Sequence, residues 1–80
     1  MSRTIGSPRH KALVSFITKK RKDAKLTQAQ VAERIGRYQS FVATFERGQK
    51  RIDAVQLVEM AEAIGFDPGE AIKVVAKTKK

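Results

Sequence analysis

Apolar residues recur at helical spacing along most of the chain, and capping residues divide this pattern into five segments. Ser7 and Pro8 form an N-cap followed by proline at the first helical position, so the first helix is expected to begin there. His10, near its start, is expected at the surface. The apolar side of this helix is expected to hold Leu13, Phe16, Ile17 and Ala24.

A short second helix is predicted after Leu26. Thr27 and Gln30 have the spacing of a capping box, in which each side chain accepts a hydrogen bond from the other residue's backbone N–H. Leu26 and Val31 match the apolar pair that often packs across such a helix start. Gly36 is expected to end the helix, whose buried side should hold Val31, Ala32 and Ile35.

A third helix is predicted from about Tyr38 to Arg47, with Gly48 as its stop. Its apolar face should hold Tyr38, Phe41, Val42 and Phe45. Its other face should hold Gln39, Ser40, Ala43, Thr44 and Arg47. A helix with a core face and an opposite face of small polar side chains is suited to reading base edges in the major groove of DNA.

Two further helices complete the pattern, after a basic loop at residues 49–51. Asp53 and Gln56 form a second capping box, and Gly65 is expected to end that helix. Its buried positions are Leu57, Met60, Ala61 and Ile64. Asp67 and Glu70 suggest a third capping box. The helix that it opens carries Ala71, Ile72 and Val75.

These segments predict an all-α fold, a compact five-helix bundle, because no stretch reads convincingly as a strand and no long linker interrupts the chain. Residues 1–7 are expected to form a flexible basic arm, residues 8–76 the helical domain, and residues 77–80 a basic tail. A core of this size is marginal, so stability must come from well-packed helices or from a partner chain.

Composition narrows the possible chemistry. The 80 residues include no cysteine and a single histidine, so we expect no disulfide, no metal site and no cofactor. No apolar run approaches the length of a membrane span, and residues 12–18 are followed by charges rather than a cleavage site. The expected compartment is therefore the cytoplasm, with no membrane partner. No small-molecule ligand is evident.

Charge is concentrated at the two ends of the chain. The net charge is +9, and residues 1–25 carry eight basic residues against one acidic residue. Residues 26–70 carry five basic and seven acidic residues, and residues 71–80 carry four basic residues only. A nearly neutral scaffold with basic ends suits a polyanionic partner such as nucleic acid. The alternative is that these charges serve solubility.

The segment from about residue 13 to residue 66 resembles the helix-turn-helix of phage repressor and Cro proteins, the XRE class. The resemblance rests on Arg21, Leu26-Thr27-Gln28, Val31-Ala32, Ile35-Gly36, Gln39-Ser40, Val42 and Glu46-x-Gly48. No single element is specific to this family, but the full set of elements in the same register is specific to it. The resemblance implies a lambda-repressor-like DNA-binding domain.

The resemblance also implies a site. Base contacts are expected from Gln39, Ser40 and Thr44, because a glutamine can pair with adenine through two hydrogen bonds and hydroxyls bond flexibly. Phosphate contacts are expected from Gln28, Arg37, Tyr38, Arg47, Lys50 and Arg51. Tyr38 could instead pack inward. The alternative for Gln39 and Ser40 is an ordinary solvated helix face.

Arg21 and Glu46 resemble the family's internal ion pair, which joins the first helix to the third. The alternative for Arg21 is a phosphate contact within the basic run of residues 19–22. Three residues depart from the family's pattern. Tyr38 stands where a small capping residue is usual, Lys20 lies on an apolar arc, and Lys25 replaces a glycine. Lys20 should extend its amine to solvent, and Lys25 should adopt a left-handed conformation.

The leading hypothesis is a sequence-specific regulator of transcription that binds double-stranded DNA and has no catalytic role. Whether it represses or activates is open. A homodimer on a palindromic operator is expected, through the end of the fourth predicted helix and the fifth, where Phe66, Ile72 and Val75 lie. The alternative is that these three residues simply close the core. The alternative is an antitoxin-like or accessory module that binds another protein. A small enzyme is not expected, because no nucleophile, base or metal cluster is visible.

Overall fold

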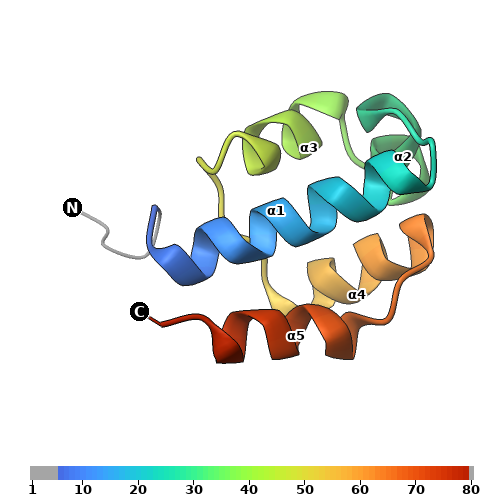
Figure 1. The fold of residues 1–80 in the computed structure, drawn as a ribbon. Helices are drawn as coiled ribbons and strands as arrows, with labels where there is room; N and C mark the ends of the chain where they lie inside the picture. The colour runs from blue at the N-terminus through green and yellow to red at the C-terminus, as the bar shows by residue number, and fades with distance from the viewer. Residues whose placement is uncertain (1–5, 80) are drawn as a thin grey trace.

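The computed structural model describes residues 6–79, and these residues form five α-helices with no strand. The helices are α1 (Pro8–Asp23), α2 (Gln28–Arg34), α3 (Gln39–Glu46), α4 (Ala54–Ile64) and α5 (Pro68–Lys77). In Figure 1, α1 crosses the middle of the molecule, with α2 and α3 above it and α4 and α5 below. The predicted all-α, five-helix architecture is confirmed. No helix in this part of the chain is long and apolar enough to cross a membrane.

Local capping interactions fix most helix ends where the sequence predicts them. The Ser7 hydroxyl accepts from the His10 backbone N–H, and both bonds of the Thr27–Gln30 and Asp53–Gln56 capping boxes are present. Gly65 ends α4 in the left-handed region, at φ 98°. Lys25 also has a positive φ, of 60°, as its position before α2 predicts. The turns between helices are therefore set locally.

Three details of the predicted helix ends differ from the structure. The Asp67 carboxylate accepts from the Gly69 backbone N–H (2.9 Å) and does not form a capping box with Glu70. Tyr38 and Arg47 flank α3 as its caps and are not part of it. Because Tyr38 is extended, its side chain does not follow the helical period, and it is 87% exposed instead of lying on the apolar face.

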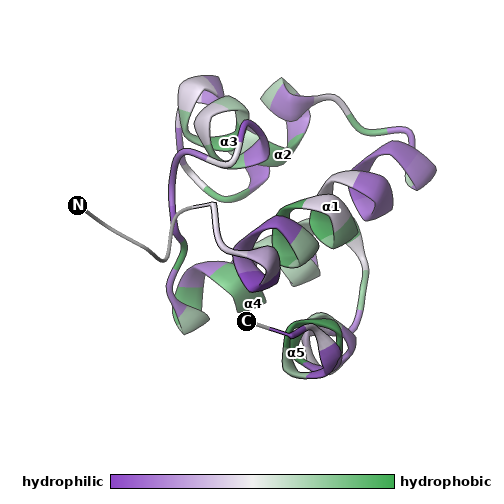
Figure 2. Cartoon of the chain, turned by 60° about the vertical axis from the view of Figure 1, so that its left-hand side comes forward, coloured by the Kyte–Doolittle hydropathy of each residue, from purple (hydrophilic) through white to green (hydrophobic). Residues whose placement is uncertain are grey.

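The core takes side chains from all five helices. The largest of the fully buried side chains are Phe45, Ile17, Met60, Val31 and Val42. Figure 2 shows hydrophobic and hydrophilic segments on each helix, as expected when one side of each is buried. The predicted core positions of α4 are all buried. On α1, Val14 is buried, whereas Ala24 is an exposed C-cap beyond the last helical residue, so its predicted place on the apolar side is wrong.

The two ends of α1 contact α5. Arg9 donates to the Thr78 carbonyl (2.8 Å), near the C-terminal end of α5. At the other end, the Lys20 amine lies 5.4 Å from the centre of the Phe16 ring and 4.0 Å from the Glu70 carboxylate. The Phe16 ring packs edge-on against Phe66. Lys20 therefore lays its stem over the core and keeps its amine at the surface, as predicted.

His10 is buried, at 5% exposure, and its predicted surface position is wrong. Its ring meets the Phe45 ring edge-on, at 6.3 Å between centres, because the start of α1 packs over the end of α3. Burial lowers the pKa of His10 below its ordinary value of 6.5. The nearby charge of Arg51 lowers this pKa further, and a hydrogen bond with the Gly48 backbone opposes the shift.

A nearly buried ion pair joins α1 to α3. Arg21 donates through Nε to Oε2 of Glu46 (2.6 Å) and through Nη2 to Oε1 (2.9 Å). Its Nη1 donates to the Leu26 carbonyl (2.8 Å), and the two side chains are 11% and 8% exposed. Hydrogen bonding to Glu46 raises the pKa of Arg21 above its ordinary value, although burial opposes this shift. The structural ion pair expected from the sequence is present.

We predict that Glu46→Ala destabilises the fold strongly. The substitution leaves the Arg21 charge almost buried without its carboxylate, a change that typically costs about 3–5 kcal/mol. The midpoint of thermal unfolding should fall by about 4 °C or more for each kcal/mol in a domain of this size. Asp23→Ala is the matched control, because it removes an exposed carboxylate bonded to Lys19 (2.9 Å) and should cost less than about 1 kcal/mol. Equal midpoints for the two variants would contradict the prediction.

We also predict that His10 makes stability depend on pH. Because its pKa is lowered on folding, the unfolded chain takes up a proton first as the pH falls below 6.5, and the free energy of unfolding should decrease. His10→Phe keeps an aromatic ring beside Phe45 and cannot take up the proton. Chemical unfolding at about pH 7.5 and pH 5.5, above the usual range of carboxylate titration, measures the difference. The native chain should lose more stability than the variant between these two values, and equal losses would show that His10 contributes nothing.

Candidate nucleic-acid interface

α2 and α3 pack against each other and form the helix-turn-helix unit. The turn between them passes through Gly36 at φ 70°, and the Arg37 backbone N–H donates to the Ala32 carbonyl (2.9 Å). Val42 and Phe45 anchor α3 in the core. Packing therefore sets the direction of this helix, and its opposite side is left free for a partner.

The predicted base-reading residues lie on the outer side of α3. Gln39 and Ser40 are exposed, and Thr44, one turn further on, is half-buried. The Gln39 amide donates to the Gln28 side-chain oxygen (3.3 Å), and Arg47 donates to the Thr44 hydroxyl (3.3 Å). The three predicted residues thus share one accessible face. Their contacts with DNA stay predictions.

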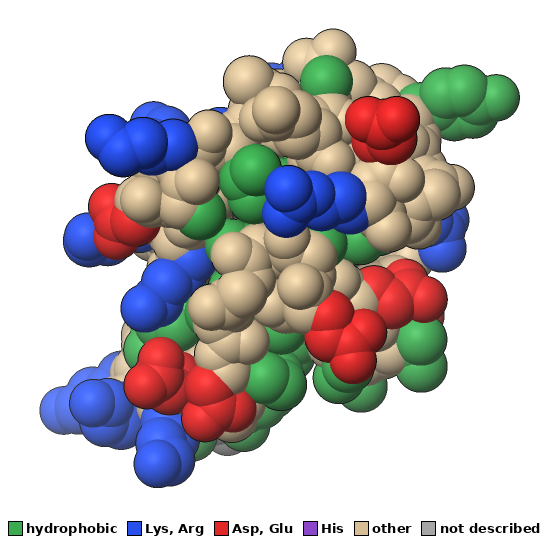
Figure 3. Space-filling model, turned by 90° about the vertical axis from the view of Figure 1, so that its right-hand side faces the viewer, with side chains coloured by type: hydrophobic (Ala, Val, Ile, Leu, Met, Phe, Trp, Pro, Cys, Tyr) green, Lys and Arg blue, Asp and Glu red, His purple; other side chains and the backbone are tan. Residues whose placement is uncertain are grey.

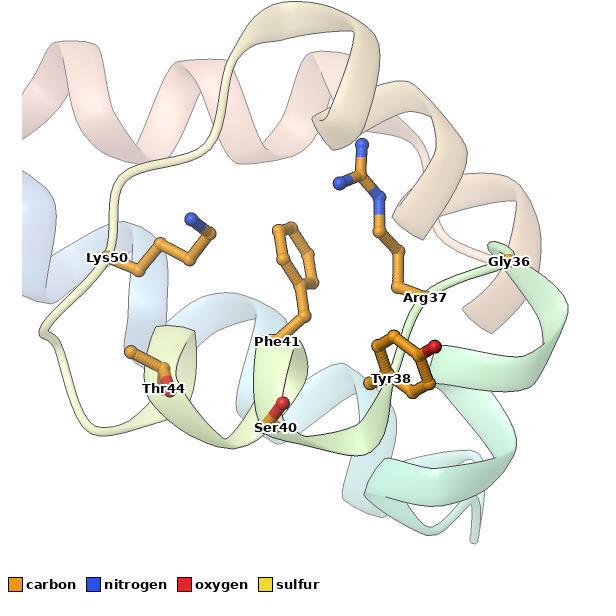
Figure 4. Close-up of a pocket in the computed structure, with 7 residues that line it drawn as sticks. All are labelled: Gly36, Arg37, Tyr38, Ser40, Phe41, Thr44 and Lys50. Carbon is orange, nitrogen blue, oxygen red and sulfur yellow. The ribbon is translucent and has the colours of Figure 1, made fainter.

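A surface hollow of about 490 Å³ lies beside this face. It is lined by Gly36, Arg37, Tyr38, Ser40, Phe41, Thr44 and Lys50. In Figure 4, the Arg37 and Lys50 side chains lie on either side of the Phe41 ring, while Ser40 and Thr44 project from α3. The guanidinium carbon of Arg37 is 5.0 Å from the ring centre, and the Lys50 amine is 5.3 Å from it. Two cations are thereby held at the edge of the reading face.

Sequence reasoning missed the part that Phe41 plays in this hollow. It assigned Phe41 to the core face, but the side chain is only partly buried and contacts both cations. Arg37 precedes the extended N-cap of α3, so the helical i,i+4 rule does not predict its contact with Phe41. Lys50 comes from the loop after α3, so only the folded chain brings it to the ring.

Of the other residues predicted to contact phosphate, Gln28 and Arg47 bond to residues of this face, and the charge of Arg51 lies near His10. Tyr38, Arg37, Arg47 and Arg51 are exposed, whereas Gln28, at the start of α2, is half-buried. Its amide donates to Oε1 of Glu46 (2.8 Å), a contact that the sequence did not indicate. Figure 3 shows the molecule from the end where α1 meets α2. In that view Lys and Arg side chains lie mainly along the left edge, and acidic side chains are spread over both halves, with more of them in the lower half.

The residues expected near a contact between protomers differ in exposure. Phe66 packs against Phe16 beside the core and is half-buried. Ile72 is 55% exposed and Val75 is half-buried. On α4, Val55 and Val58 are also exposed, and the sequence did not single them out. Exposed apolar side chains are therefore present on both α4 and α5.

Within residues 6–79, no group of three or more His, Asp or Glu side chains is placed to hold a metal ion. The chemistry of this face is therefore that of hydrogen-bonding amides and hydroxyls beside cationic side chains. Such a set can bind phosphate oxygens and base edges.

Comparison with known proteins gives the same fold. A family model described as a helix-turn-helix domain matches residues 12–72. No curated protein matches the chain. An XRE-family-like protein from Pseudomonas syringae pathovar tomato is similar in structure, with 32% identity, a TM-score of 0.82, and coverage of 92% of this chain and 90% of that one.

Two further solved structures are similar. The restriction-modification controller protein C.AhdI from Aeromonas hydrophila is 28% identical, with a TM-score of 0.69 over 81% of this chain and 99% of that one. The clp gene regulator ClgR from C. glutamicum, at 22% identity, shares the fold, with a TM-score of 0.77 over 85% of this chain and 88% of that one. The family model covers most of the chain, and the exposed face of α3 has the expected polar character, so this chain belongs to the helix-turn-helix domain family and is an XRE-type DNA-binding protein.

Proposed function

We propose that this protein is a sequence-specific regulator of transcription that places α3 in the major groove of double-stranded DNA. The proposal rests on the two faces of α3, of which one is buried in the core and the other is exposed. Val42 and Phe45 are buried, while Gln39 and Ser40 face outward beside a rim of cationic side chains. Two structures with similar folds are described as a gene regulator and a controller protein, which supports a regulatory role.

In this proposal, the outward residues of α3 read bases and the surrounding residues hold the DNA backbone. Gln39 pairs with adenine through two hydrogen bonds, and Ser40 and Thr44 bond to neighbouring base edges. Phosphate contacts come from Gln28, Arg37, Tyr38, Arg47, Lys50 and Arg51. These contacts give affinity and register, whereas the three residues of α3 give sequence preference.

We further propose a homodimer on a palindromic operator. One α3 reads only a short sequence, and two copies related by a two-fold axis would place their recognition helices about 34 Å apart, one turn of DNA. Exposed Ile72 on α5, with Val55 and Val58 on α4, supports a contact between protomers in this region. The same apolar surface supports the alternative function, an antitoxin-like or accessory module that binds a different protein. In that case DNA binding would be secondary.

Selection of bound sequences from random double-stranded DNA, at one stated salt concentration, tests the proposed function. A homodimeric regulator should enrich one palindrome whose half-sites lie about one helical turn apart. Enrichment of a single half-site would support the reading face but contradict the dimer. Recovery of random sequences would contradict sequence-specific recognition and favour the protein-binding alternative.

We predict that Gln39→Ala and Arg51→Ala affect binding differently. Removing the Gln39 amide from its base should cost about 1–3 kcal/mol on the selected site and relax the preference at one base position in each half-site. Arg51→Ala should weaken binding to all sequences similarly. The slope of log K against log salt concentration should become shallower by about one unit for each phosphate that the variant no longer neutralises. Affinities of both variants for the selected site and for scrambled DNA measure this. If Gln39→Ala weakened binding to both DNAs equally, Gln39 would contact the DNA backbone and not a base.

A further inference from the structure

We propose that Phe41 positions Arg37 and Lys50 to bind two neighbouring phosphates of one DNA strand, so that an aromatic residue raises affinity without reading a base. The inference rests on the proposed function, in which both cations contact the DNA backbone. It starts from the order of chemical groups along the hollow beside α3. A cation, an aromatic ring and a second cation follow one another there (Figure 4).

The Phe41 ring holds these two cations on either side of it. The guanidinium carbon of Arg37 lies 5.0 Å from the ring centre, and Nζ of Lys50 lies 5.3 Å from it. The electron-rich face of an aromatic ring attracts cations at such distances. Arg37 precedes α3 and Lys50 follows it, so the ring limits how far apart the charges at the two ends of this helix can move.

The two cations have no other polar partner in the described part of the chain. Within residues 6–79, neither the Arg37 nor the Lys50 side chain forms an ion pair or a hydrogen bond. Lys20 also lies over an aromatic ring, but its amine has the Glu70 carboxylate 4.0 Å away. The charges beside α3 are therefore available to an anion from outside the protein.

This order of groups complements the backbone of a DNA strand. Along a strand, each deoxyribose lies between two phosphates, so an apolar surface separates two negative charges. In the hollow, the Phe41 ring separates two positive charges, and both are of the kind that binds phosphate oxygens. Ser40 and Thr44 line the same hollow and belong to the predicted reading face. A strand bound here would therefore run along the edge of that face.

Holding the cations in advance reduces the entropy cost of binding. A long side chain that becomes ordered only in the complex loses rotamer freedom, and this loss lowers affinity. Arg37 and Lys50 already lie against the ring in the free protein, so less freedom remains to be lost. Because phosphates are the same in every sequence, the gain applies equally to all duplexes. Phe41 is thus a positioning residue for affinity and not for sequence choice.

The first experiment compares Phe41→Leu with Phe16→Leu, because leucine keeps an apolar side chain but has no aromatic face. Phe16 is the matched control. It is also partly buried beside the core and lies 5.4 Å from a lysine amine, but its ring packs against Phe66 and not beside α3. Dissociation constants are measured for the selected site and for scrambled DNA at one salt concentration. Phe41→Leu should weaken binding to both by about fivefold or more, the effect of leaving two long side chains unordered, and Phe16→Leu by less than about twofold.

Duplexes that each carry one uncharged phosphate test the spacing of the two contacts. In each duplex, a methylphosphonate of similar shape replaces one phosphate of the selected site. The native chain should lose affinity at several positions, including two neighbours on one strand of each half-site. Arg37→Ala should abolish the loss at one of these neighbours, and Lys50→Ala should abolish it at the other. Phe41→Leu should reduce both losses, because the cations are no longer held in place.

The free protein provides a test that needs no substitution at Phe41, and it decides the matter if Phe41→Leu does not fold. Protons that lie over an aromatic face give NMR signals upfield of their usual positions. The methylene protons next to the Lys50 amine and the Arg37 guanidinium should show this shift in the absence of DNA. Ordinary shifts for both groups would contradict the role assigned to the ring. Thermal unfolding of each variant verifies that affinities are compared on folded protein.

The outcomes separate this inference from the proposed function. If the native chain shows no preference among duplex sequences, the proposed function fails and the inference fails with it. If it prefers a site but the folded Phe41→Leu and Phe16→Leu variants bind alike, the role of Phe41 is wrong and the regulator remains. Phosphates of Arg37 and Lys50 that are not neighbours also overturn the inference, as does a larger loss on the selected site than on scrambled DNA. Equal losses on both DNAs, with neighbouring phosphates, support it.

Discussion

The hydrogen-bonded ion pair between Arg21 and Glu46 is the constraint on which the arrangement of α1, α2 and α3 depends. Two nearly buried charges are tolerable only if their hydrogen-bonding groups are satisfied. Here the guanidinium reaches both carboxylate oxygens and the Leu26 carbonyl, and the carboxylate also accepts from Gln28. A pair of this kind adds little to stability when compared with apolar packing, but it specifies geometry. It fixes α3 relative to the end of α1 and the start of α2.

α3 needs this external support because it is short and poorly capped. Eight residues do not form a stable helix alone in water, and Tyr38 supplies no side-chain hydrogen bond at its start. Burial of Val42 and Phe45 and the bonds to Glu46 hold it in place. The polar residues on its outer side are then presented in a fixed register. The Phe41 ring similarly keeps the cations of Arg37 and Lys50 at the edge of that face.

Features encoded by neighbouring residues could be predicted from the sequence, and features that depend on distant contacts could not. The Thr27–Gln30 and Asp53–Gln56 capping boxes are local, and both are present. His10 has the helical spacing of the buried Val14 and Ile17, so periodicity does place it on the core side, but its contact with Phe45 joins two helices and cannot be read from that spacing. The bond between Gln28 and Glu46 joins residues 18 positions apart. The Arg21–Glu46 pair is also non-local, and only resemblance to a known family indicated it in advance.

In the proposed function, the face formed by α3 and the cations around it binds the backbone and bases of duplex DNA. The salt dependence of binding to the selected site tests it most directly. A dimer that neutralises about 6–10 phosphates should show a slope of log K against log salt of about −0.9 for each phosphate. A steep linear decrease in this range is the predicted result. A flat response would contradict this proposal, because a face with the cations of Arg37 and Lys50 at its edge cannot bind DNA without displacing its counterions.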